Sequence, residues 1–147
     1  MILEETRFSD LLVMGTHNPE AGGLGDLAGS LILSTGRPVL IVPPETPAKK
    51  VGQRVMVGWD ASTPAARAVN DAIPLLAGAD EVDIVAINAE SSQAGVGAIR
   101  CAEIGRHLAR HGIKAETQSI SVDNVGVADV LMSRAADRKV DLFVMGA

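Results

Sequence analysis

Short apolar runs alternate with longer amphipathic stretches along most of the chain. The runs are rich in Val, Ile, Leu and Met but too short for buried helices, so they predict strands over 10–15, 38–42, 55–58, 81–89 and 141–146. Alternation of apolar and polar residues predicts a further strand over 113–122. The amphipathic stretches predict helices over 26–35, 63–77, 92–111 and 124–138, and residues 1–8 resemble the last turns of another.

Strands separated by helices are typical of an α/β fold, a doubly wound and mostly parallel open sheet with helices on both faces. In each of the last two predicted helices, residues three or four positions apart lie on one face, which we expect to point inward. These residues are Ile99, Ala102, Gly105 and Leu108 in 92–111, and Ala128, Leu131 and Ala135 in 124–138.

The strand 55–58 passes into its helix through an acidic turn. Ser62 or Thr63 is the expected N-cap, and Pro64 suits the first turn. Because ligands of open α/β sheets bind outside the carboxyl ends of strands, Asp60 is the first candidate binding residue. The alternative is that its carboxylate only accepts backbone N–H groups of the turn. Trp59 beside it is either a lid over a ligand or a plug in an empty cleft.

The composition of the chain excludes some classes of function but does not identify one. The 147 residues suit one domain, with 47% hydrophobic and 21% charged residues, and a net charge of −5 argues against a nucleic-acid binder. An aromatic content of 2% supplies no stacking platform for single strands. The lone Cys101 is expected to be buried in a reducing compartment, and no apolar run reaches membrane-spanning length. We expect a soluble cytoplasmic protein that does not bind membranes.

The two ends of the chain are similar to each other. A shift of 131 positions lays 10–16 over 141–147, and also Arg7 over Arg138 and Met1 over Met132. Chance similarity of two apolar strands is the alternative. The repeat predicts that 1–42 closes one copy, that 43–53 is a proline-containing linker, and that 54–147 is most of a second copy. We expect 54–147 to pack as one α/β unit with 1–42.

Taken as two partial copies, the chain resembles the universal stress protein family. Residues 55–62 resemble the opening strand and acidic turn of that family. The stretch from Met14 and Gly15 through Gly29 and Ser30, followed by 38–42, resembles its closing phosphate loop and last strand. The resemblance implies a strand order of 3-2-1-4-5, in which the strand 55–58 is central.

The resemblance also implies an adenine-nucleotide site. By position, Asp60 would address the adenine, Ile87 would offer its backbone, and Gly15, Gly29 and Ser30 would contact the phosphates; Met145 and Gly146 begin the same motif in the second copy. The loop departs from the family pattern G-x2-G-x9-G-S/T. Asn18 replaces the second glycine, its interval to Gly29 is one residue too long, and Pro19 lies inside; Gly22, Gly23 and Gly25 offer an alternative nest.

We therefore expect a regulatory or ligand-binding module of the stress response that binds ATP or another adenine nucleotide weakly, with Mg²⁺ brought by the nucleotide. A scaffold or dimerisation domain is the first alternative, and a hydrolase using His17 is the second. His107 and His111 have metal-ligand spacing but no evident third ligand, so a solvated face is expected. The strands 10–15 and 141–146 compete for one slot beside the central strand. The loser would offer an edge for a homodimer.

Overall fold

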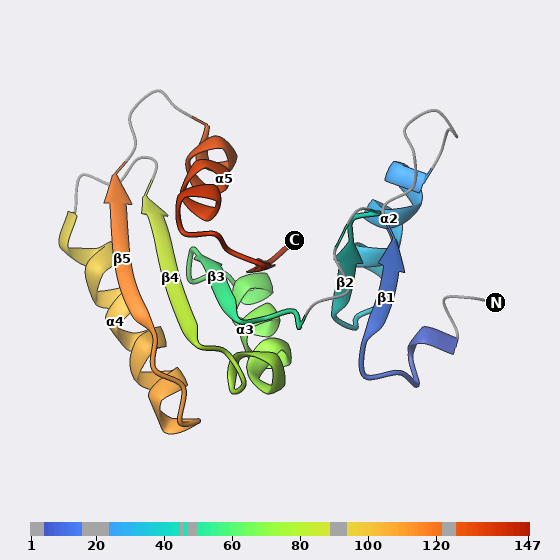
Figure 1. The fold of residues 1–147 in the computed structure, drawn as a ribbon, viewed down its shortest axis with the longest axis horizontal. Helices are drawn as coiled ribbons and strands as arrows, with labels where there is room; N and C mark the ends of the chain where they lie inside the picture. The colour runs from blue at the N-terminus through green and yellow to red at the C-terminus, as the bar shows by residue number, and fades with distance from the viewer. Residues whose placement is uncertain (1–4, 16–23, 45, 47–49, 89–93, 122–125) are drawn as a thin grey trace. The chain divides into compact units, whose positions relative to one another are not determined.

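The computed structural model describes residues 5–15, 24–44, 46, 50–88, 94–121 and 126–147. The chain divides into two compact units: unit 1 is Met1–Lys49 together with Ala147, and unit 2 is Lys50–Gly146. Both units contain parallel strands joined through helices (Figure 1). Of the expected first helix, only the short turn at residues 5–8 is described. Within the described segments, no helix is both long and apolar enough to cross a membrane.

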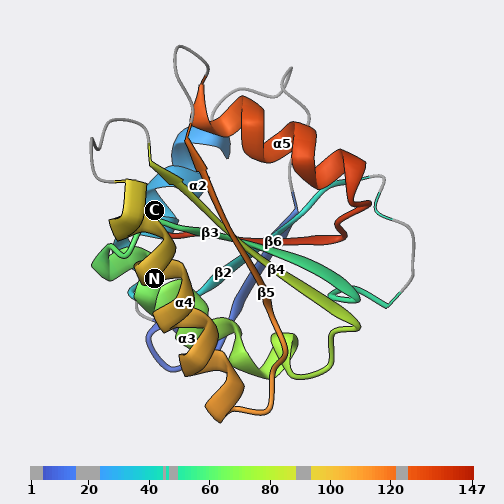
Figure 2. The ribbon, with the colours of Figure 1, turned by 90° about the vertical axis from the view of Figure 1, so that its left-hand side faces the viewer.

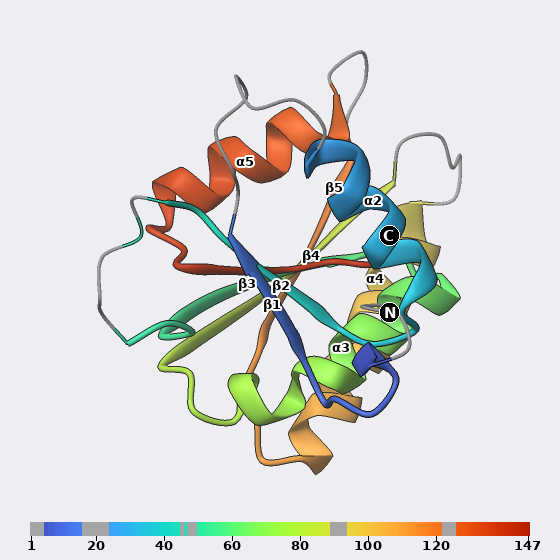
Figure 3. The same ribbon diagram turned by 90° about the vertical axis from the view of Figure 1, so that its right-hand side faces the viewer.

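Unit 1 is a two-stranded parallel sheet with one connecting helix (Figures 1 and 3). Strand β1, Leu12–Gly15, leads through α2, Leu24–Ser34, to β2, Val39–Val42. The register runs from Leu12 opposite Val39 to Gly15 opposite Val42. Each element begins and ends within about two residues of its expected bounds, as is usual for patterns of apolar spacing.

Unit 2 contains the larger sheet and three helices. Its elements are β3 (Arg54–Trp59), α3 (Thr63–Leu76), β4 (Glu81–Asn88), α4 (Ala94–Arg110), β5 (Glu116–Ser121), α5 (Val127–Asp137) and β6 (Leu142–Val144). The strand order is β5-β4-β3-β6, and every pair is parallel. The α/β fold class is confirmed. The observed order agrees with the first four positions of the expected 3-2-1-4-5, with β3 inside the sheet.

Helices cover both faces of this sheet, with α3 and α4 on one face and α5 on the other (Figure 2). Successive side chains of a strand point to opposite faces, so a doubly covered strand must be apolar throughout. In β3, Val55, Met56 and Val57 are all fully buried. Met56 packs with Val85 and Leu131 in the core beneath α5. By alternation, its two neighbours face α3 and α4.

The buried face of α4 differs from the expected one. Cys101, Ile104 and Leu108 are buried, whereas Ile99 is 62% exposed and Ala102 is also exposed. Two overlapping stripes of helical spacing share the region around 105–108, and spacing alone does not choose between them. Gly105 of the expected stripe does lie against the sheet, because a Cβ added to it would be 3.0 Å from the Thr117 side chain of β5. In α5, Leu131 is buried and Ala135 packs beside the core beneath α5, but Ala128 is exposed, contrary to expectation.

The slot beside β3 is occupied by β6. Val55 pairs with Leu142, and the register continues to Val57 opposite Val144. Asp141, directly before β6, accepts hydrogen bonds from the backbone N–H groups of Gly52, Gln53 and Arg54 at 3.1–3.2 Å. This carboxylate therefore ties the start of β3 to the start of β6. β1, which was the other candidate for the slot, pairs with β2.

Candidate functional site

A cleft lies at the carboxyl end of β3 in unit 2, where the chain turns into α3. Its volume is about 140 Å³. It is lined by Gly58, Trp59, Asp60, Ala65, Val85, Val127, Leu131, Met145 and Gly146. This is the edge of a parallel sheet at which ligands of such folds bind. We call it the Asp60 cleft.

The turn between β3 and α3 is built by short polar side chains. The N–H of Ser62 donates to Asp60 Oδ1 at 2.8 Å, and the N–H of Ala65 donates to Ser62 Oγ at 3.2 Å. Ser62 is thus the N-cap of α3, which decides between the two candidates left by the sequence. Between these residues, Ala61 adopts a left-handed conformation with φ of 62°. The carboxylate of Asp60 therefore has a structural role in the turn.

Asp60 is also ionised, and therefore negatively charged, at neutral pH. Hydrogen bonding from the Ser62 side chain lowers the pKa of Asp60, against a smaller opposing effect of burial, and the backbone N–H of Ser62 adds to the lowering. Its side chain is exposed. An exposed carboxylate that stays ionised at neutral pH can accept hydrogen bonds from a ligand amine while Oδ1 holds the turn.

The end of β6 brings Met145 and Gly146 to the same cleft. A Cβ added to Gly146 would lie 2.5 Å from the backbone N of Ala65 and 2.7 Å from the carbonyl carbon of Pro64. Only glycine permits this approach to the first turn of α3. Met145 is 61% exposed beside it. Two segments far apart in the sequence thus meet at the carboxyl edge of the sheet.

Ile87 lies near the same edge, although it does not line the Asp60 cleft. It follows Ala86, which pairs with Trp59, and it pairs in turn with Ile120 of β5. Its backbone is therefore one position beyond the last residue of β4 that pairs with β3. The structure brings Asp60, Met145 and Gly146 together and leaves Ile87 on the neighbouring strand.

The residues expected to contact phosphates belong to unit 1. Gly15 is the last residue of β1, and a Cβ added to it would meet only the Val42 carbonyl oxygen, at 3.9 Å. Gly29 and Ser30 lie inside α2, which begins at Leu24, and not at its start. Backbone N–H groups beyond the first turn of a helix are used by the helix itself, so they offer nothing to a phosphate. His17, Asn18, Pro19, Gly22 and Gly23 lie outside the described residues.

The apolar wall of the Asp60 cleft was not expected from the sequence. Val127 and Leu131 come from α5, and Val85 comes from β4. Leu131 was expected to point inward, but the pattern did not indicate that it would line a cleft together with Trp59. The indole Nε1 of Trp59 is buried and has no hydrogen-bond partner among the described residues.

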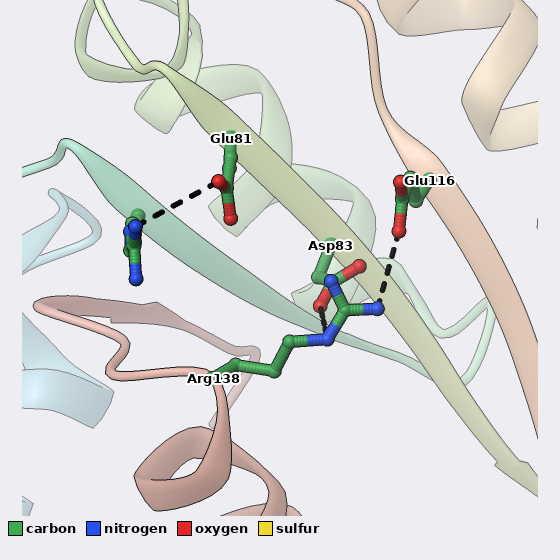
Figure 4. Close-up of polar contacts among 5 residues, drawn as sticks. Glu81, Asp83, Glu116 and Arg138 are labelled. Carbon is green, nitrogen blue, oxygen red and sulfur yellow. Dashed lines mark hydrogen bonds and ion pairs between the residues drawn. The ribbon is translucent and has the colours of Figure 1, made fainter.

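A second cleft of about 370 Å³ lies at the opposite, amino edge of the same sheet. Asp80, Glu81, Val82, Asp83, Lys114, Ala115, Glu116 and Arg138 line it. Arg138 contacts both Asp83 and Glu116 there (Figure 4). Although this cleft is the larger, its Arg138 is already paired with Asp83 and Glu116, and it does not lie at the carboxyl ends of the strands. We therefore place the candidate site at the Asp60 cleft.

Comparison with known proteins supports the fold. No family model and no curated protein matches the sequence. A structure from the universal stress protein family of Burkholderia pseudomallei is 20% identical over 67% of this chain and 84% of that chain, with a TM-score of 0.56. A protein from Mycobacterium tuberculosis is 23% identical over 64% of this chain and 70% of its own, with a TM-score of 0.53.

A universal stress protein from Archaeoglobus fulgidus is similar over a longer stretch. It aligns with 98% of this chain and 53% of its own length, at 15% identity and a TM-score of 0.73. At this level of identity, the likeness concerns the fold. The chain has the fold of the universal stress proteins.

Proposed function

We propose that this chain is a regulatory module of the universal stress protein type, and that its Asp60 cleft binds the base of an adenine nucleotide. The observation that carries the proposal is the meeting of Asp60 with Met145 and Gly146 at the carboxyl edge of the sheet. These are positions at which the family resemblance places nucleotide contacts. A role in a cytoplasmic stress response belongs to the same proposal.

The chemistry of the Asp60 cleft suits a purine. The ionised Asp60 accepts hydrogen bonds from an exocyclic amine, and Val85, Val127 and Leu131 supply apolar contact for a flat ring. A volume of about 140 Å³ is small beside the roughly 300–1,000 Å³ of ordinary ligand sites. A cleft of this volume has room for a base but not for a whole nucleotide, so we expect weak binding.

Phosphates contribute little to this binding. Gly29 and Ser30 lie inside α2, where their N–H groups are not available. We therefore expect adenosine and Mg-ATP to bind with similar affinity. This is a departure from family members in which the glycine loop holds the phosphates.

We also propose that the chain corresponds to the end of one repeat and most of the next. The similarity between 10–16 and 141–147 supports this. The alignment of nearly the whole chain with 53% of the Archaeoglobus fulgidus protein supports it too, because that protein is nearly twice as long.

The test uses the fluorescence of Trp59, the only tryptophan of the sequence and a residue of the Asp60 cleft. Adenosine and Mg-ATP are titrated into the protein, and both should quench the signal. Asp60→Asn keeps an oxygen for the Ser62 N–H but removes the charge, so it should weaken binding about tenfold while the fold is kept. Asp71→Asn, at an exposed position of α3, is the matched control and should bind normally.

Two results would contradict this assignment. Equal affinity in the wild type and Asp60→Asn would remove Asp60 from the site. Loss of Mg-ATP binding in Ser30→Ala, with adenosine binding intact, would show that α2 holds phosphates after all.

An assembly function is the second candidate, because unit 1 exposes large apolar side chains. Phe8 is 92% exposed, Leu33 77% and Val13 58%. Exposed apolar surface of this kind is typical of a protein interface. A homodimer formed through a sheet edge would have twice the 15.2 kDa of one chain in light scattering. A monomeric mass at micromolar concentration would contradict it.

A hydrolase is the third candidate, and its expected base, His17, lies outside the described residues. Release of phosphate from Mg-ATP tests it directly. Turnover that is lost in His17→Ala would favour the enzyme, and absence of turnover in the wild type would exclude it.

A further inference from the structure

We propose that His107 and His111 form a chelating site for a divalent transition-metal ion with a preference for imidazole, such as Cu²⁺. His107 lies in the last turn of α4, and His111, four positions further along the chain, directly follows the last residue of that helix. Positions four apart lie one above the other on a helix face. The two ring centroids are 5.0 Å apart, with an angle of 61° between the ring planes. The two imidazoles are thus close enough for one ion to contact both.

The hydrogen bonds around His107 fix which of its nitrogens can bind an ion. Asn70 of α3 donates from Nδ2 to the carbonyl oxygen of Ala66 at 2.8 Å, so its Oδ1 is turned to the neighbouring helix. That oxygen lies 3.2 Å from His107 Nε2. Since an amide oxygen can only accept, Nε2 must carry the proton, and the lone pair of neutral His107 is on Nδ1.

This arrangement is the one that metal-binding histidines use. Such residues usually donate the second ring N–H to an oxygen that holds the tautomer and the orientation of the ring. Asn70 provides that oxygen from a different helix. His107 is therefore already in the tautomer that a metal ion requires.

Arg110 is the group that an ion would displace. Its Nη2 lies 3.3 Å from His107 Nδ1 and donates to the lone pair. The contact is exposed, and an exposed interaction of a long side chain contributes little to stability. The neighbouring His111 is also exposed.

The ligand set decides the class of ion. The described residues contain no group of three or more His, Cys, Asp or Glu side chains arranged around one ion. Two imidazoles with the remaining positions open to water suit Cu²⁺, Ni²⁺ or Zn²⁺, and among these Cu²⁺ binds most tightly to a given site. Mg²⁺ and Ca²⁺ prefer oxygen ligands and should not compete.

The experiment is a calorimetric titration of the whole chain with Cu²⁺ in a non-coordinating buffer, followed by electron paramagnetic resonance of the bound ion. One ion per chain with nitrogen hyperfine structure is expected. His107→Ala and His111→Ala should each weaken this binding about a hundredfold, because each removes one of two linked ligands. His17→Ala is the matched control, since His17 is the only other histidine, and it should bind like the wild type.

Two further variants separate this site from adventitious binding to a single histidine. Asn70→Ala should weaken binding about tenfold or more, because it removes the acceptor that holds the tautomer. Arg110→Ala should strengthen binding, because it removes the competing donor and a positive charge. Unchanged affinity in both histidine variants, or weaker binding in Arg110→Ala, would overturn the proposal.

Discussion

The guanidinium of Arg138 at the end of α5 lies against the buried carboxylate of Asp83 in β4, with 3.2 Å between Nε and Oδ2. The Asp83 side chain is only 9% exposed. Arg138 Nη2 also contacts Glu116 Oε2 of β5 at 3.1 Å (Figure 4). Burial raises the pKa of Asp83, and the positive charge of Arg138 opposes that rise. One arginine thus connects α5 to two strands at the amino edge of the sheet.

Removal of this arginine should destabilise the protein clearly. Arg138→Met leaves the Asp83 carboxylate buried without its cation, so we expect the thermal midpoint to fall by several degrees. Arg106→Met is the matched control, because it removes an exposed pair with Glu103 and should change the midpoint by about a degree or less. Equal effects of the two variants would show that Asp83 does not depend on Arg138.

The cost of Arg138→Met should depend on pH. The folded-state pKa of Asp83 is raised, so the folded protein holds this proton more tightly than the unfolded chain does. The stability contributed by the protonated group is lost as pH rises from the unfolded to the folded pKa. Without Arg138 the folded pKa rises further, which widens this interval. The urea midpoint of Arg138→Met should therefore lie closer to that of the wild type at pH 4 than at pH 7. An equal difference between the two proteins at both pH values would contradict this assignment.

Ala61→Gly should stabilise the turn below the Asp60 cleft. Ala61 has φ of 62°, a left-handed conformation that is unfavourable for a residue with a Cβ and free of that strain in glycine. After the greater flexibility of glycine in the unfolded chain is subtracted, we expect a gain of about 0.5–1 kcal/mol in the free energy of unfolding. Ala77→Gly, at φ of −63°, is the control and should destabilise. A loss in Ala61→Gly would show that the turn is not strained.

Gly146→Ala should be poorly tolerated. Its Cβ would lie 2.5 Å from the backbone N of Ala65, so β6 and α3 would have to move apart. We expect a loss of about 1–3 kcal/mol in the free energy of unfolding. Gly29→Ala is the control, because an added Cβ there has no atom within 4 Å, and alanine favours a helix interior. Similar stability of the two variants in urea would contradict the close approach.

Asp141→Ala should loosen the pairing of β3 with β6. Its carboxylate accepts from the N–H groups of Gly52, Gln53 and Arg54, and we expect the loss of these charged hydrogen bonds to cost about 2 kcal/mol. Asp10 has the same place in the sequence repeat but lies exposed, two residues before β1, so Asp10→Ala is the matched control and should have little effect. Amide hydrogen exchange at the start of β3 provides the local measurement, with faster exchange expected only in Asp141→Ala.

The sequence alone determined the elements and their order of alternation. Apolar runs such as the one that became β3 can only be strands covered on both faces, and the amphipathic stretches between them can only cover such a sheet. The turn at Asp60 was also readable, because Asp, Ser and Pro at those positions have local reasons to be there. Local chemistry and spacing suffice for features of this kind.

Only the tertiary structure decided which of two similar strands lies beside β3, which stripe of α4 faces the sheet, and which cation pairs with the Asp83 carboxylate. The same holds for the orientation of Asn70, which sets the tautomer of His107 from another helix. Each of these depends on the contacts between residues far apart in the chain. The residue spacing within one segment does not determine with which distant segment it pairs, in what register, or how that segment buries or neutralises its side chains.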